Sequence, residues 1–359
     1  MFLSPPLKEI HISMSQAWIH SEVPRNILPV IASTISTLPT SILELLLVDT
    51  TRFRRVSWAY FQDSFSSVAL RCGPSLRKFD SPVPLSDAAV DHLVRLPHLN
   101  TWRVDGPPPT FSTLTFPLIF PPLTKFTLGE GAASGWFCLF ERLERGVSVT
   151  QRVPPLAKVK ESLKHLRVQD FHSPCPIVNV SFASTVQIFQ NLVCLNVGAM
   201  CPSERNEGPC IFRLNNDNVT EIVVALSQLE SLVLGRPCFE NTCATTVACL
   251  LPISVHCIKL EKLEIHFNTT NIVDDIKGMS EDSQIEELRS LPRCTLMCLD
   301  VHHIPLTLDE PGFGTVMNGM VDIFPSLEFC GGHDRTWREL SVRIERFKPP
   351  EQVLRKSSL

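Results

Sequence analysis

One pattern of apolar and polar positions returns along the chain: an apolar residue, two variable residues, an apolar residue, one variable residue and an apolar residue. Clear copies stand at 99–104, 163–168, 229–234 and 260–265. First positions of successive copies are separated by as few as 23 residues (Leu76 to Leu99) and as many as 40 (Leu123 to Leu163). Short strands that recur at such intervals are typical of stacked repeats, with the apolar side chains on one face.

This pattern predicts an α/β leucine-rich-repeat solenoid, in which a curved parallel sheet carries helices on its outer side. We expect irregular repeats of 23–40 residues in a single array over 1–348, followed by a flexible C-terminal tail over 349–359. The array brings the variable positions of neighbouring copies into columns on the side of the sheet away from the helices.

Helices are predicted between the strands. Leu-Pro and Phe-Pro pairs mark boundaries ahead of several strands, because proline cannot continue a helix and the residue before it favours extended backbone. Gly312-Phe313-Gly314 is interpreted as a loop that precedes a helix. Capping residues and helical spacing predict helices over 86–94, 216–226, 281–291 and 316–324, and two aromatic-rich segments, 58–70 and 136–143, are expected to pack beneath the strands.

Composition and charge narrow the classes of partner. Apolar residues make up 44% of the 359 positions, which is enough for a continuous buried core. The formal net charge of −4 gives no basic footprint for nucleic acid. With no apolar run of 18 residues and no N-terminal signal pattern, we expect neither a membrane partner nor secretion. Thirteen cysteines without a C-x-x-C pair favour free thiols in the cytoplasm or nucleus.

The repeat copies resemble a known family. The segments 96–104 (Leu-Pro-His-Leu-Asn-Thr-Trp-Arg-Val) and 219–234 resemble fungal F-box/leucine-rich-repeat proteins, especially the large set in mushroom-forming, basidiomycete-type fungi. The resemblance implies that the repeats select a protein for ubiquitination, while an F-box recruits a Skp-type adaptor. Because a repeat copy already begins at Leu7 and 23–28 does not match an F-box, the resemblance is to the repeat region. A Skp-type adaptor is expected only if an F-box lies upstream.

Two charged clusters are predicted on the open face of the sheet. A basic cluster lies in the middle of the chain, and an acidic cluster that carries histidines lies near its end; together they predict a face for a protein partner of unknown identity. The alternative is an ordinary solvated face. The residues are Arg103, Lys125, His165 and Arg167 in the first cluster, and Glu264, His266, Asp300 and His302 in the second.

No catalytic motif stands out from the pattern. Glu264, His266, Asp300 and His302 are also ligand types that zinc accepts, but surface histidines are the better interpretation, so no metal is expected. There is no G-x-S-x-G motif, and Gly129-Glu130-Gly131 lacks the rest of a phosphate loop. We therefore expect no enzyme activity and no cofactor, but a protein–protein interaction module. The alternative is a stand-alone structural or regulatory scaffold without a ubiquitin-ligase role.

Overall fold

The chain packs as two compact units, Met1–Cys175 and Pro176–Leu359. The expectation of a single repeat array over 1–348 stays a prediction, and the tail over 349–359 lies outside the described residues. The computed structural model describes residues 8–14, 33, 44–49, 62–81, 83–106, 120–129, 132–145, 156–169, 181–198, 214–235, 244–281, 292, 294–301, 306, 308–332 and 335–347.

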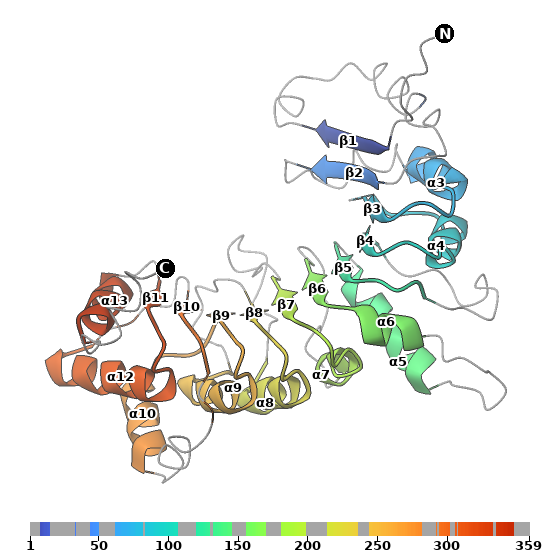
Figure 1. The fold of residues 1–359 in the computed structure, drawn as a ribbon. Coiled ribbons are helices and arrows are strands. Elements are labelled where there is room, and N and C mark those ends of the chain that lie inside the picture. The colour runs from blue at the N-terminus through green and yellow to red at the C-terminus, as the bar shows by residue number, and fades with distance from the viewer. Residues whose placement is uncertain are drawn as a thin grey trace. The chain divides into compact units, whose positions relative to one another are not determined.

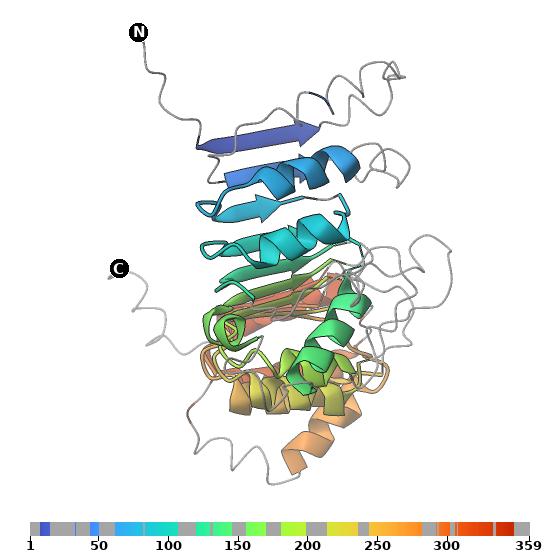
Figure 2. The same ribbon diagram turned by 90° about the vertical axis from the view of Figure 1, so that its right-hand side faces the viewer.

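The described part of the first unit contains a parallel sheet of six strands, and each strand pairs with the next one along the chain (Figures 1 and 2). The copies that begin at Leu7, Leu76, Leu99, Leu123 and Leu163 each contribute one strand. The strands are β1 (Glu9–Met14), β2 (Glu44–Asp49), β3 (Lys78–Asp80), β4 (Thr101–Val104), β5 (Lys125–Leu128) and β6 (His165–Val168).

Helices cover one side of this sheet (Figure 1). Neighbouring helices in the chain also pack together, as α3 does with α4. The opposite side of β3 to β6 carries the variable residues of the repeat copies. The helices of this unit are α3 (Gln62–Arg71), α4 (Asp87–Val94), α5 (Ala133–Arg145) and α6 (Ala157–Ser162).

The second unit repeats the arrangement within its described residues. Five parallel strands again pair in chain order: β7 (Cys194–Val197), β8 (Ser231–Leu234), β9 (Lys262–Ile265), β10 (Cys298–Asp300) and β11 (Phe329–Gly331). Its helices are α7 (Ser181–Val186), α8 (Asn216–Ala225), α9 (Leu250–His256), α10 (Ile272–Glu281), α12 (Glu310–Ile323) and α13 (Arg335–Phe347), with a 3-10 turn η3 (Val247–Cys249) before α9. An α/β fold built on parallel strands is therefore confirmed.

The apolar positions of the repeat copies form the core of each unit. The middle apolar residues of the strands, such as Leu166, Leu232 and Leu299, are 0% exposed. In the first unit, Trp102 of β4 stacks edge-on against Trp136 of α5, with ring centroids 5.4 Å apart. The aromatic segment 136–143 thus packs beneath the strands as predicted. Burial of these large side chains is the main force holding helix and sheet together.

Local sequence signals set the helix boundaries. In α4, the Ser86 hydroxyl caps the first turn, and the Asn215 side chain does the same for α8 by accepting from the Asn218 backbone N–H. The prediction of a loop at Gly312-Phe313-Gly314 is wrong, because Asp309 caps α12 and these residues form its first turns. Most of the helix predicted over 281–291 lies outside the described residues, as do residues 58–61.

Candidate functional site

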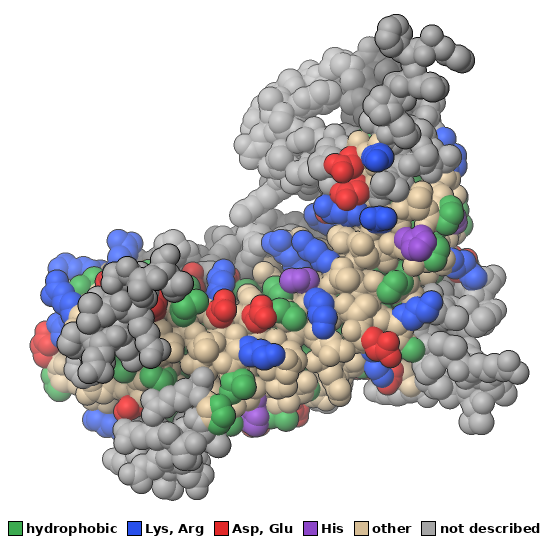
Figure 3. Space-filling model, viewed as in Figure 1, with side chains coloured by type: hydrophobic (Ala, Val, Ile, Leu, Met, Phe, Trp, Pro, Cys, Tyr) green, Lys and Arg blue, Asp and Glu red, His purple; other side chains and the backbone are tan. Residues whose placement is uncertain are grey.

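The strand register of the first unit brings the predicted basic residues onto one face. Lys125 of β5 is the register partner of His165 of β6, and Arg103 and Arg167 both align with Thr127 between them. We call these four side chains, Arg103, Lys125, His165 and Arg167, the basic face. They alternate along their strands with fully buried apolar residues, so they lie on the side of the sheet opposite the core. Figure 3 shows Lys and Arg side chains gathered over this region.

Arg103 is neutralised from within the sheet. Its Nε donates to Asp105 Oδ1 at 3.2 Å, and Asp80 Oδ1 of the neighbouring strand lies 3.9 Å from the same nitrogen. The Asp105 side chain is only 7% exposed, so this pair is shielded from solvent. Gly129 makes room for it, because a Cβ at that position would overlap the Asp105 carboxylate. Arg103 therefore acts as an internal counterion rather than as a charge offered to a partner.

Asp80 is the central anion of the basic face. Its Oδ1 is buried and accepts no hydrogen bond from the residues that the structure describes. Burial raises the pKa of the Asp80 carboxyl, although Arg103, Lys78, Lys125 and Arg167 each lower it. The cations of β5 and β6 thus act on a carboxylate of β3. Thr127, the register partner of both Arg103 and Arg167, is only 8% exposed.

The cations of β5 and β6 differ from Arg103. Within the described part of the chain, Lys125, His165 and Arg167 have no carboxylate in hydrogen-bond or ion-pair contact, whereas Lys78 lies 3.9 Å from Glu44. Arg167 instead donates to the side-chain amide oxygen of Gln169, the residue that directly follows β6. On the open face, positive charge is therefore neutralised by carboxylates over β2 to β4, whereas β5 and β6 carry excess positive charge.

The second predicted cluster is brought together only in part. Glu264 of β9 and Asp300 of β10 are register partners on the open face, and Lys262 lies 3.6 Å from Glu264. His266 is 5% exposed, so its ring is not presented on the surface as the prediction required. It follows the end of β9 and directly precedes the fully buried Phe267. His302 lies outside the described residues.

Burial keeps three described thiols of this unit protonated, and acidic neighbours add to the effect at one of them. Burial, and then Asp300, raise the pKa of the half-buried Cys298 thiol, and Glu264 adds to the shift while Lys262 opposes it. Burial also raises the pKa of Cys257 to about 12 and that of Cys294 to about 11. Thiolates are the reactive form of cysteine. Cys257 and Cys294 therefore serve as small apolar core residues at neutral pH.

No group of three or more His, Cys, Asp or Glu side chains in the described ranges is arranged to hold a metal ion. None of the helices that the structure describes has both the length and the apolar composition of a bilayer span.

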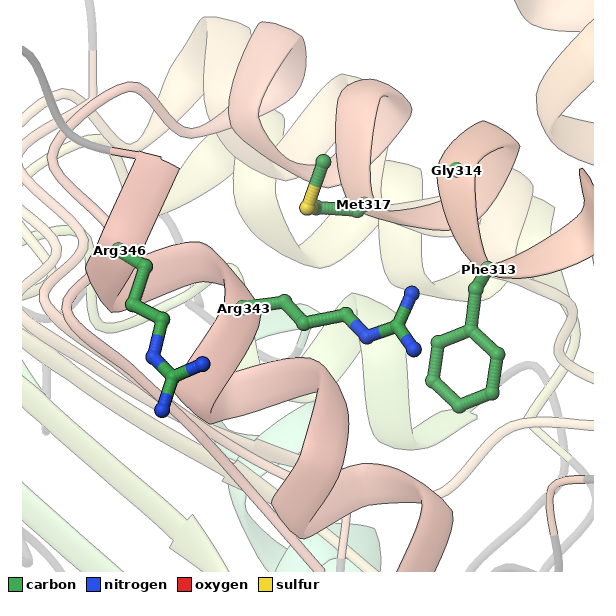
Figure 4. A pocket seen from close by; sticks show the side chains of 5 residues that line it. All are labelled: Phe313, Gly314, Met317, Arg343 and Arg346. Carbon is green, nitrogen blue, oxygen red and sulfur yellow. The ribbon is translucent and has the colours of Figure 1, made fainter. Parts of the chain in front are cut away.

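A shallow pocket of about 320 Å³ lies between α12 and α13 (Figure 4). Phe313, Gly314 and Met317 line it from α12, and Arg343 and Arg346 line it from α13. The Arg343 guanidinium lies 4.6 Å from the centre of the Phe313 ring. It also donates to both oxygens of Glu310 at 3.0 Å and to Glu339 at 2.8 Å. Two carboxylates thus occupy the guanidinium of Arg343.

The sequence did not single out three residues that shape the basic face. Asp80, Asp105 and Gly129 are separated in the chain and meet only through the register of β3, β4 and β5. Asp80 stands in the same column as Arg103 and Arg167, so the alternation of signs in that column was the available signal. The neutralisation of Arg103 by Asp105 had no sequence signal, since it depends on the space left by Gly129.

The chain matches no protein-family model, and no curated protein is similar to it in sequence.

Proposed function

We propose that the chain is a leucine-rich-repeat solenoid that binds a partner protein through the open faces of its sheets and performs no reaction of its own. The observation that carries the proposal is the distribution of side chains on β3 to β11. One face is uniformly apolar and buried, and the other bears mainly polar and charged residues aligned in columns, with the apolar Val233 and Phe329 among them. Solenoids of stacked repeats typically use such a surface for recognition.

The role that fits best is recognition of a protein for ubiquitination. It rests on the resemblance of the repeat copies at 96–104 and 219–234 to fungal F-box/leucine-rich-repeat proteins. In that role a Skp-type adaptor would join the complex through an F-box, while the repeats contact the substrate. A stand-alone scaffold would bind its partner without the adaptor, so co-purification of the native protein with or without a Skp-type adaptor separates the two roles.

Site-specific photo-cross-linking in native extract tests partner binding. A photoreactive residue placed at Thr101 or Ser231, both partly exposed on strand faces, is expected to capture a discrete protein. The matched control places the same group at Lys158 on α6, which is exposed on the helical side. Equal capture from all three positions, or from none, would rule out recognition by the open face. Charge reversal by Lys125→Glu with Arg167→Glu is expected to abolish the specific product.

A further inference from the structure

We infer that Lys125, His165 and Arg167 form an anion-binding site, the β5–β6 site, that takes a carboxylate-rich segment of a partner protein. The inference rests on the proposed function and names the chemistry of the partner. Lys125 and His165 are neighbours across β5 and β6, and Arg167 projects from the same face two residues further along β6. All three side chains belong to exposed residues.

Charge balance on the open face identifies these residues as the partner-facing ones. Over β2 to β4, the positive charges are paired with carboxylates: Lys78 with Glu44, and Arg103 with Asp80 and Asp105. Over β5 and β6, the described residues of the open face include no carboxylate, and Lys164 adds an exposed cation at the rim directly before β6. Cations without a carboxylate in contact attract a partner of complementary charge and speed its association.

Strand register keeps the cations close together. Lys125 aligns with His165, and Arg167 lies two residues further along β6, beside Thr127 of β5. Both Lys125 and Arg167 also lower the pKa of the Asp80 carboxyl. One ligand segment can therefore meet both cations. A guanidinium offers two parallel donors to a carboxylate, and the Lys125 ammonium adds a point charge beside it.

Protein is favoured over nucleic acid as the source of the anion. The described open face of β3 to β6 carries no Phe, Tyr or Trp side chain on which bases could stack: its residues are Lys78, Asp80, Thr101, Arg103, Lys125, Thr127, His165 and Arg167. Stacking platforms and a continuous basic groove are the usual features of single-strand binding. Here the carboxylates of Asp80 and Glu44 interrupt the positive charge after two strands, which limits the site to a short acidic segment.

The test measures binding of a fluorescent oligo-glutamate peptide to the full chain at low salt, by fluorescence anisotropy. Lys125→Ala combined with Arg167→Ala is expected to weaken binding about tenfold, and added salt is expected to weaken binding to the unaltered chain. Lys158→Ala, which removes an exposed cation from α6, is the matched control and should leave affinity unchanged. Circular dichroism checks that each variant is folded.

A second variant tests the site in the opposite direction. Asp80→Asn removes the anion that competes for Lys125 and Arg167, so it should tighten peptide binding about threefold. Unchanged affinity in both the double variant and Asp80→Asn would overturn the site. Tighter binding of a single-stranded oligonucleotide than of oligo-glutamate would overturn the choice of partner. If cross-linking captures a protein but these variants have no effect, the proposed function stands and only this site is ruled out. If the peptide binds but no protein is captured, the site stands and the proposed function is contradicted.

Discussion

At the scale of single residues, the open face depends on a glycine. Gly129 lies against the Asp105 carboxylate, and a methyl group there would displace the acceptor that holds Arg103 at 3.2 Å. We expect Gly129→Ala to lower the free energy of unfolding by about 1–3 kcal/mol, measured by urea denaturation. Gly278→Ala is the matched control: nothing lies within 4 Å of the added Cβ, so the substitution in α10 should stabilise by about 0.5–1 kcal/mol. Equal effects of the two would contradict the role of Gly129.

Asp80 gives a prediction about pH. Burial raises its pKa in the folded protein above the ordinary value of 3.8, so folding favours the protonated carboxyl. The contribution of this carboxyl to the free energy of unfolding is fully present at pH values below 3.8. It is lost as the pH rises through the pKa of Asp80 in the folded protein. Asp80→Asn should therefore raise the free energy of unfolding at pH 7 by at most about 1 kcal/mol, since solvent screens a side chain that is 33% exposed. The difference between variant and parent should vanish below pH 3.8; a larger gain in acid would contradict this sign.

At the scale of elements, capping side chains determine where helices begin. The Asn215 oxygen accepts from the Asn218 N–H at 2.8 Å, and the Asn218 side chain accepts in return from the Asn215 N–H. We expect Asn215→Ala to cost about 1 kcal/mol in thermal or chemical unfolding. Asn215→Asp keeps an acceptor at the same position and should cost little. If both substitutions are equally destabilising, the loss arises from packing around Leu214 rather than from the cap.

Strands were predictable from the sequence because their signal is local. Each three-residue or four-residue strand carries its own alternation, as in β6, where His165 and Arg167 are exposed and Leu166 and Val168 are 0% exposed. The start of α12 was not predicted, since two glycines near Pro311 suggested a loop. Asp309 caps the helix there, and proline is well suited to a first turn.

The candidate site was predictable in position but not in charge. Alternation placed Lys125, His165 and Arg167 on one face, and the register confirms that they are neighbours. That Arg103 is neutralised depends on contacts between residues of three strands, and that His266 is buried depends on packing beyond the end of β9. Neither is encoded in a single repeat copy, so sequence periodicity could not reveal them.

At the scale of the whole molecule, stacking in chain order implies that a disturbance stays close to its origin. Leu263 of β9 is 0% exposed and is the register partner of Leu232 on one side and Leu299 on the other. In such architectures, each repeat is stabilised mainly by its immediate neighbours. Local openings therefore should have free energies of their own, below that of global unfolding.

Hydrogen exchange of the full chain tests this locality. Leu263→Ala removes about 2–5 kcal/mol of local packing, so amides of β8, β9 and β10 should exchange faster while those of β3 to β5 change little. Val224→Ala is the control, because that side chain of α8 is 53% exposed and its loss should leave exchange in β8 to β10 unchanged. Uniform acceleration in both units would show a single cooperative core instead of neighbour-by-neighbour stabilisation. If the faster amide exchange is confined to β8 to β10, substitutions in the second unit leave the β5–β6 site intact. Effects on recognition can then be assigned to one unit at a time.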